Sequence, residues 1–176
     1  MNRVLTTEVM EGGRAGDILA RTTAAALAVS SADCAALFQD LVRRLAEILD
    51  VDAAVISVFK EGDPARMTTL AAWLDGKPLE NFEYELAKTP CGAVVGQVSR
   101  FVGTGVHAEF APGTALSAMG FDSYAAHAMC DPAGHQVGLL VALHRGPMRD
   151  RALTEALLQI FAVRADAYAG VRNDEI

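Results

Sequence analysis

The stretch FDSYAAHAMCDPAGHQVGLLVALH, residues 121–144, decides the fold class. Two apolar runs, 121–129 and 136–144, flank the turn-forming segment 131–134, so the sequence predicts an antiparallel β-hairpin. Both alternating sets of the second run are apolar, so we expect both faces of the sheet to be covered. Gly138 lacks a side chain and would let a neighbouring element approach closely.

A second hairpin is predicted upstream. Residues 53–59 are β-branched and aromatic, residues 61–64 carry turn chemistry with a longish loop, and residues 67–74 form the partner strand. Residues 79–86 alternate aromatic and charged side chains and indicate a third strand. Residues 101–106 indicate a further short strand.

Helical periodicity surrounds these strands. Apolar residues after position 33 recur at i, i+3 and i+4, which predicts a helix with one buried face: Leu37, Phe38, Leu41, Val42, Leu45, Ile48 and Leu49. An Ala-rich first helix is expected at 18–29 and a short helix at 90–96, with Thr89 as its cap. A second short helix ends at Gly120.

The last helix, at 150–171, is capped by Asp150. It is expected to carry an apolar face of Leu153, Leu157, Ile160, Val163 and Ala167. Leu158 and Phe161 widen this face beyond what one sheet contact needs, which suits a dimer interface; the alternative is a helix buried deeply within its own domain.

Antiparallel hairpins with helices at the ends indicate an α+β fold with five or six strands. We expect one domain at 17–171, with its core at 33–167, a flexible tail at 1–16 and a short tail at 172–176.

Composition restricts the partners. The net charge of −7 and the scattered arginines argue against nucleic acid and anionic membranes, which require clustered positive charge. No apolar run approaches the roughly 20 residues of a membrane span, and the N-terminus does not resemble a signal peptide, so a cytoplasmic location is expected. Cys34, Cys91 and Cys130 form no CxxC pair, so neither a disulfide framework nor a metal site is expected.

Enzyme signatures are missing: the sequence has no phosphate-binding loop, no GxSxG elbow and no HExxH. We therefore expect a protein that is not an enzyme, with a thiol-dependent reductase using Cys91 or Cys130 as the minor alternative. Cys91 at a helix N-terminus would have a lowered pKa and suit redox sensing; the alternative is a small buried packing residue. His127 is a pocket hydrogen-bonding residue, a haem or metal ligand, or a core residue.

Four segments carry a family resemblance: YELAKTPC at 84–91, FDSY at 121–124, DPAGHQVG at 131–138 and LLQIFAVRA at 157–165. Together they resemble bacterial GAF sensor domains, most closely those beside histidine kinase, phosphodiesterase and diguanylate cyclase modules. The resemblance extends from about residue 33 to residue 167. The cyclic-nucleotide NKFDE signature and the bilin-attachment context are absent, so no ligand or cofactor is implied.

The resemblance implies a six-stranded antiparallel sheet, with the terminal helices on one face and a small-molecule pocket of loops and short helices on the other. It implies a homodimer through the terminal helices and a signalling output protein as a further partner. The expected function is sensing of an unidentified small molecule; the alternative is a dimerisation module without a ligand. The pocket residues it suggests are Trp73, Tyr84, Cys91, Phe110, Tyr124 and His127.

Overall fold

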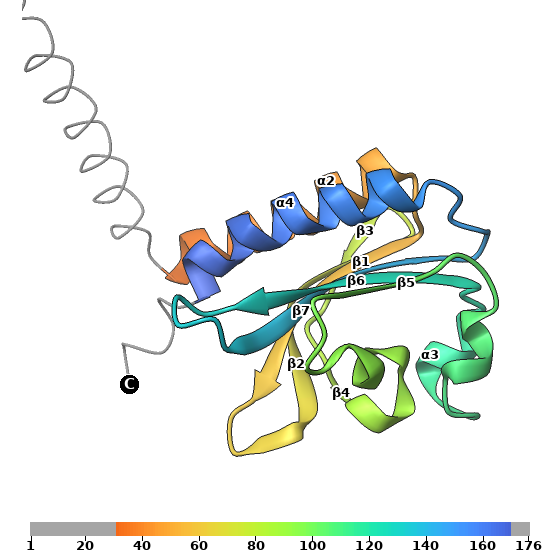
Figure 1. The fold of residues 1–176 in the computed structure, drawn as a ribbon, viewed down its shortest axis with the longest axis horizontal. Coiled ribbons are helices and arrows are strands. Elements are labelled where there is room, and N and C mark those ends of the chain that lie inside the picture. Colours follow the sequence, from red (N-terminus) through yellow and green to blue (C-terminus); the bar gives the residue numbers. More distant parts are fainter. Residues whose placement is uncertain (1–30, 170–176) are drawn as a thin grey trace, which may run out of the picture.

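The structure, a computed structural model, describes residues 31–169. An antiparallel sheet in the order β3-β2-β1-β7-β6-β5 forms the centre, and a further short strand, β4, pairs with β2. The long helices α2 and α4 lie side by side on one face, whereas β4 and the short helices lie on the other (Figure 1). The expected α+β fold is confirmed. The predicted first helix at 18–29 and the tails at 1–16 and 172–176 lie outside the described residues.

The elements are α2 (Ser31–Leu49), β1 (Ala53–Lys60), β2 (Asp63–Leu74), β3 (Lys77–Leu79), β4 (Glu83–Glu85), η1 (Leu86–Lys88), η2 (Pro90–Val94), β5 (Ser99–Val102), η3 (Val106–Glu109), α3 (Ala115–Ala118), β6 (Ser123–Cys130), β7 (Gln136–His144) and α4 (Arg151–Ala169).

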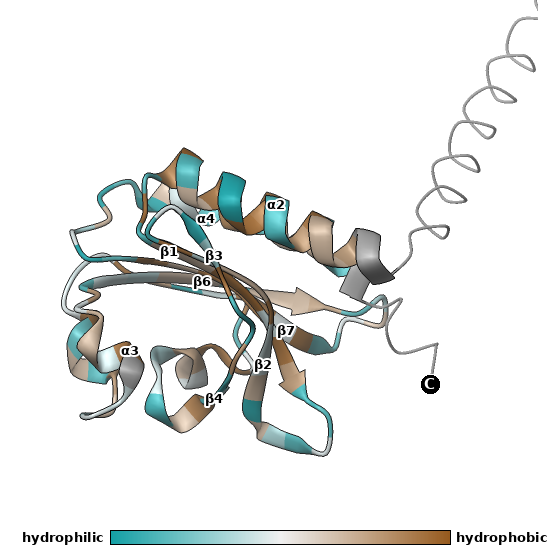
Figure 2. Cartoon of the chain, turned by 180° about the vertical axis from the view of Figure 1, so that it is seen from behind, coloured by the Kyte–Doolittle hydropathy of each residue, from teal (hydrophilic) through white to brown (hydrophobic). Residues whose placement is uncertain are grey.

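Two apolar clusters cover the two faces of the sheet. The helix-face cluster joins α2 and α4 to strand residues such as Ile56, Ala125 and Leu140. The opposite-face cluster joins Tyr124 and Val141 to the short helices. Figure 2 shows the brown, apolar central strands between these two layers. The stripe predicted for α2 is confirmed in its centre, where the buried residues are Phe38, Leu41, Val42 and Leu45.

The β6–β7 hairpin that decided the fold class is confirmed, and β7 has the predicted bounds. The edge of β7 that does not face β6 pairs with β1, where Val58 lies opposite Gly138. A Cβ atom on Gly138 would collide with the backbone carbonyl of Ser57. Glycine at this position therefore permits the close approach of β1 that the sequence suggested.

The first hairpin is tighter than predicted. Lys60 pairs with Asp63, which leaves a two-residue turn at Glu61 and Gly62, and β2 begins at Asp63. Gly62 has a φ of +75°, a conformation that glycine adopts without a steric penalty. Two residues therefore close this hairpin, and the longer loop predicted at 61–64 is not present.

The single strand predicted at 79–86 is wrong, because β3 and β4 pair separately with β2. Between them, one backbone hydrogen bond from the Thr69 N–H to the Phe82 carbonyl is joined by side-chain bonds. The hydroxyl of Thr69 accepts a hydrogen bond from the Phe82 N–H at 2.7 Å, and the Asn81 amide donates to the Leu70 carbonyl. The strand predicted at 101–106 is also shifted, since β5 ends at Val102 and the short helix η3 begins at Val106.

Helix α4 begins as predicted, because the Asp150 carboxylate accepts a hydrogen bond from the Leu153 N–H at 2.9 Å. Deep burial of this helix is wrong. It buries Thr154, Leu158, Ala162 and Ala165 against its own domain. Leu153, Ile160 and Val163 are instead 50%, 63% and 62% exposed, so an apolar stripe faces outward. Between residues 31 and 169, no helix has both the length and the apolar character needed to cross a membrane.

Candidate functional site

A cavity of about 420 Å³ lies between the sheet face opposite the long helices and the segments β4, η1 and α3. This volume falls in the range of small-molecule pockets, roughly 300–1,000 Å³. Its apolar walls are Ala53, Val55, Ala72, Leu74, Leu79, Phe82, Leu116, Met119, Phe121 and Leu143. Such walls suit the apolar body of a ligand.

Charged side chains line one part of the cavity. Lys88 lies 2.9 Å from Glu85, and Arg66 lies 3.6 Å from Glu83 and 3.5 Å from Glu85. Lys60, just outside the cavity, contacts Glu83 at 2.8 Å and is the main reason that the pKa of Glu83 is lowered. We call Arg66, Glu83, Glu85 and Lys88 the cavity mouth. Its charges are partly exposed, so they add little to stability.

A small extension of about 30 Å³ continues from the cavity toward Cys91, Phe110 and Tyr124, and Tyr84 lines both spaces. The extension has room for little more than a water molecule. The hydroxyls of Tyr84 and Ser57 are 2.7 Å apart, and the Tyr124 hydroxyl donates to Cys91 Sγ at 3.4 Å. Here polar groups are buried and paired with one another.

Burial changes the proton affinity of these groups. It raises the pKa of the Cys91 thiol, and it raises the pKa values of Tyr84 and Tyr124 well above their usual range. All three groups therefore carry their protons at neutral pH. They offer hydroxyl and thiol groups to a ligand and no negative charge.

Arg145 supports the far wall of the cavity. Its guanidinium binds the Asp75 carboxylate at 2.6 and 3.1 Å, and its Nε donates to the Met119 carbonyl at 2.9 Å. It also lies over the Phe121 ring, 5.5 Å from the ring centre. Arg145 thus ties the end of β2 to the segment that carries Met119 and Phe121.

A family model described as "GAF domain" matches residues 33–168, most of the chain. The chain belongs to the GAF domain family. No curated protein sequence matches it. The predicted resemblance is confirmed.

Solved structures share this GAF fold. The GAF domain of an Acinetobacter phosphoenolpyruvate-protein phosphotransferase is 15% identical, with a TM-score of 0.63 over 87% of this chain and 92% of that one. A GAF domain from A. aeolicus in an inactive state is 13% identical, with a TM-score of 0.54 over 79% of this chain and 84% of that one.

The chromophore-binding domain of a Stigmatella aurantiaca bacteriophytochrome is 12% identical, with a TM-score of 0.60 over 85% of this chain. This GAF domain spans 58% of that longer fragment. At these identities the comparisons show the fold.

The structure brings four of the six suggested pocket residues together: Tyr84, Cys91, Phe110 and Tyr124 surround the small extension. Trp73 borders the main cavity. Along β2 it shares a side with Ala71, however, and it packs against the helix-face cluster. Trp73 therefore lies at the boundary between the cavity and the helix-face cluster.

The expectation that His127 lines the pocket is wrong. Side chains of a regular strand alternate between faces, and His127 shares its parity with Ala125 and Met129, both of the helix-face cluster. It lies close enough to Asp166 of α4 to help lower that carboxyl's pKa, although burial raises the pKa overall. Among the described residues, no group of three or more histidine, cysteine or acidic side chains could hold a metal.

The expected activation of Cys91 is also wrong. The segment Pro90–Val94 is a five-residue 3-10 helix, and burial has the larger effect on the thiol, so its pKa is raised and not lowered. Thr89 precedes this helix but makes no side-chain cap; its hydroxyl donates instead to the Leu86 carbonyl at 3.3 Å. The alternative of a buried packing residue describes Cys91 correctly.

Several lining residues were not suggested by the sequence, above all Arg66, Lys88, Leu116 and Met119. Leu116 lies within the short helix α3 and Met119 is its C-cap; their i, i+3 spacing was a weak sign of one apolar face. Arg66 and Lys88 acquire their place only when β4 and η1 fold over β2.

Proposed function

We propose that this GAF domain senses a small molecule in the 420 Å³ cavity and acts by binding and not by catalysis. The observation that carries the proposal is the apolar cavity itself, formed between a rigid sheet and the short segments β4, η1 and α3. A ligand there would contact both layers. Binding would therefore bias the position of the short segments relative to the sheet.

The regulatory part of the proposal rests on the family and its neighbours. One neighbour is the chromophore-binding domain of a bacteriophytochrome, and a fold relative that binds a small molecule supports a ligand-binding role for this chain. We infer a cytoplasmic regulator that acts on an output protein or domain. The raised pKa of the buried Cys91 thiol disfavours the thiol-dependent reductase.

Thermal-shift screening of the purified chain against a small-molecule library tests this function. Ligands that raise the melting temperature should lose this effect in Ala72→Leu, because the Ala72 side chain faces the cavity and a larger one would fill it. A library with no stabilising compound, or compounds that stabilise the filled variant equally, would contradict binding at this site.

A second candidate function, dimerisation, is favoured by one observation. Helix α4 presents the exposed apolar side chains Leu153, Ile160 and Val163 on the side away from its own sheet contacts. A contiguous apolar stripe of this kind suits contact with another protein surface. We infer a homodimer through the long helices, which would transmit a change in the sheet to the partner chain.

A further inference from the structure

Arg66 stands at the cavity mouth with longer contacts to its carboxylate partners than Lys60 and Lys88 have. Its guanidinium nitrogens lie 3.6 Å from Glu83 and 3.5 Å from Glu85, whereas charge-assisted hydrogen bonds are about 2.7–2.9 Å long. Arg66 adds to the lowering of the pKa of Glu83, after the larger effect of Lys60, and its side chain is about one-third exposed. Both of its carboxylate contacts are long, so the guanidinium can bind an additional anion at a shorter distance.

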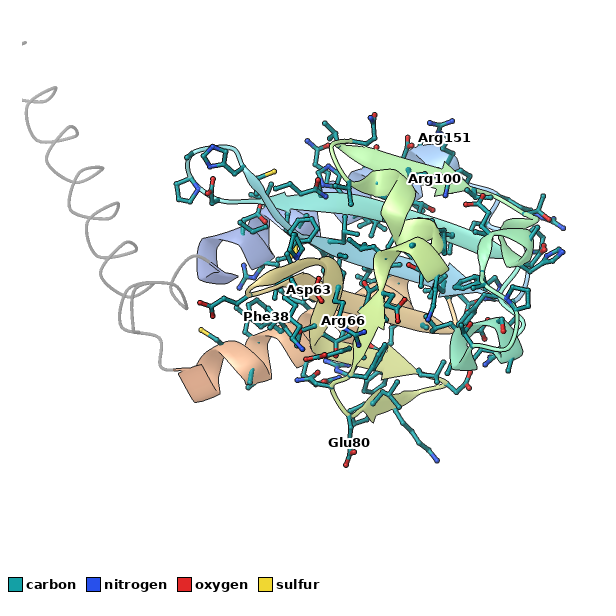
Figure 3. The ribbon with its side chains drawn as sticks, turned by 90° about the horizontal axis from the view of Figure 1, so that it is seen from below. Phe38, Asp63, Arg66, Glu80, Arg100 and Arg151 are labelled. Carbon is teal, nitrogen blue, oxygen red and sulfur yellow. The ribbon has the colours of Figure 1, made fainter. Side chains whose placement is uncertain are left out.

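Other arginines near the cavity are already occupied. Arg100, on β5 near Tyr124, holds both oxygens of Glu109 at 2.6 and 2.8 Å. Arg145 holds Asp75 in the same two-pronged way. Figure 3 looks at the molecule from below, the side of the short helices, with Arg66 and Arg100 labelled. Arg66 differs from both in lacking a bidentate partner.

The four mouth residues carry no net charge, and Lys60 beside them brings the local count to one positive unit. Lys60, Arg66 and Lys88 face the two carboxylates Glu83 and Glu85, and the lysines already contact these carboxylates at 2.8 and 2.9 Å. The chain as a whole carries −7, so this local excess is opposite in sign to the rest. One additional negative charge would balance this group of five side chains, and a phosphate dianion would exceed that balance.

We propose that the ligand is an organic acid whose apolar body fills the cavity and whose single carboxylate is bound by Arg66. This inference rests on the proposed function, since it names the ligand class of the same cavity. The planar guanidinium matches the two oxygens of a carboxylate. The apolar walls, which include Val55, Leu79 and Phe82, accept a hydrocarbon or aromatic body.

Matched pairs of probes test the carboxylate separately from the apolar body. Octanoate and octanamide, and 4-phenylbutanoate and 4-phenylbutanamide, are titrated into the full chain by calorimetry. Trp73, the single tryptophan of the sequence, borders the cavity, and its fluorescence reports binding there. We expect each acid to bind about tenfold or more tightly than its amide.

Variants assign this preference to one residue. Arg66→Gln should reduce the acid-to-amide ratio to near one and leave amide affinity unchanged. Arg66→Lys keeps the positive charge but loses the planar guanidinium, so it should lower the acid-to-amide affinity ratio only in part. It replaces the glutamine variant in this test if that variant does not fold. Lys60→Gln, which removes the cation beside the mouth, should retain most of the preference, because Lys60 does not line the cavity.

The two proposals fail differently. Equal binding of acid and amide by the unaltered chain would overturn the organic-acid inference and leave the cavity as a binding site. Loss of the preference in Lys88→Gln with retention in Arg66→Gln would overturn the assignment to Arg66. Absence of binding by all four probes would overturn the organic-acid inference, and the library screen would then decide the proposed function.

Discussion

The hydroxyl oxygens of Tyr84 and Ser57 lie 2.7 Å apart and join the short strand β4 to the centre of the sheet. The same Tyr84 hydroxyl lies 3.7 Å from Cys91 Sγ, which Tyr124 contacts from β6. Segments that are distant in sequence are thus held together by polar contacts beneath a cavity with apolar walls. This link holds the inner end of the candidate ligand site in place.

Removing either hydroxyl of this pair should lower the free energy of unfolding by more than half of what removing both would, because the remaining hydroxyl is left buried without its partner. Tyr84→Phe leaves the fully buried Ser57 hydroxyl without its partner, and Ser57→Ala removes the main partner of the Tyr84 hydroxyl. We expect each to lower the free energy of unfolding by about 1–2 kcal/mol in urea titrations. The double variant should lose less than the sum, since no hydroxyl of this pair remains buried. Strictly additive losses would contradict the link.

Gly138→Ala should destabilise the sheet. The added Cβ would meet the Ser57 carbonyl, which is backbone and cannot rotate away, so β1 and β7 must separate. We expect a loss of about 1–3 kcal/mol in urea titrations. Gly146→Ala is the matched control, because its Cβ would meet only the ring of His144, the end of a side chain. Equal losses in both variants would refute the close approach of the two strands.

Much of this fold was readable from local pattern. Two apolar runs on either side of residues 131–134 predict the β6–β7 hairpin, and apolar residues at i, i+3 and i+4 predict α2. The face of His127 was also readable: it follows the inward-facing Tyr124 by three positions, so a regular strand places the two on opposite faces. Parity along β6 therefore places His127 on the helix face of the sheet and not in the pocket.

The features of the fold and the site that the sequence did not predict depend on contacts between residues distant in sequence. The interruption between β3 and β4 depends on two hydrogen bonds between segments that are distant in sequence: the Thr69 hydroxyl accepts one from the Phe82 N–H, and the Asn81 amide donates one to the Leu70 carbonyl. Arg66 becomes part of a site only because β4 brings Glu83 and Glu85 beside it. The outward direction of Ile160 depends on which side of α4 meets the sheet, and the apolar residues around this helix leave that choice open.

Alkaline pH should destabilise the domain through its buried thiol and phenols. The pKa values of Cys91 and Tyr124 are raised in the folded state, chiefly by burial, so the folded chain keeps protons that the unfolded chain releases. Their contribution is complete below the ordinary values, about 8.5 for cysteine and 10 for tyrosine, and is lost as pH rises from there toward the folded-state values. Each group can contribute up to about 1.4 kcal/mol per pH unit.

Thermal melts from pH 7 to 11 measure this dependence. Cys91→Ala should flatten the decline that starts near the ordinary cysteine pKa, and Tyr124→Phe should flatten the part that starts about one to two units higher. Cys130→Ala is the comparison: burial also raises the pKa of that thiol, but it is only partly buried, so its removal should flatten the decline less than Cys91→Ala. Profiles of unchanged slope in the Cys91 and Tyr124 variants would show that the buried groups do not control alkaline stability.

Charge placed on the outward stripe of α4 should weaken self-association. Ile160 is 63% exposed in the single chain, and a dimer through the long helices would bury it, so Ile160→Arg would place an unpaired charge in that contact. We expect the dimer dissociation constant to rise about tenfold or more in sedimentation experiments, with little change in the melting temperature of the monomer. Gln159→Arg adds the same charge at the neighbouring exposed polar position and should have a smaller effect. A chain that is monomeric without substitution, or equal weakening by both variants, would exclude the stripe as the dimer contact.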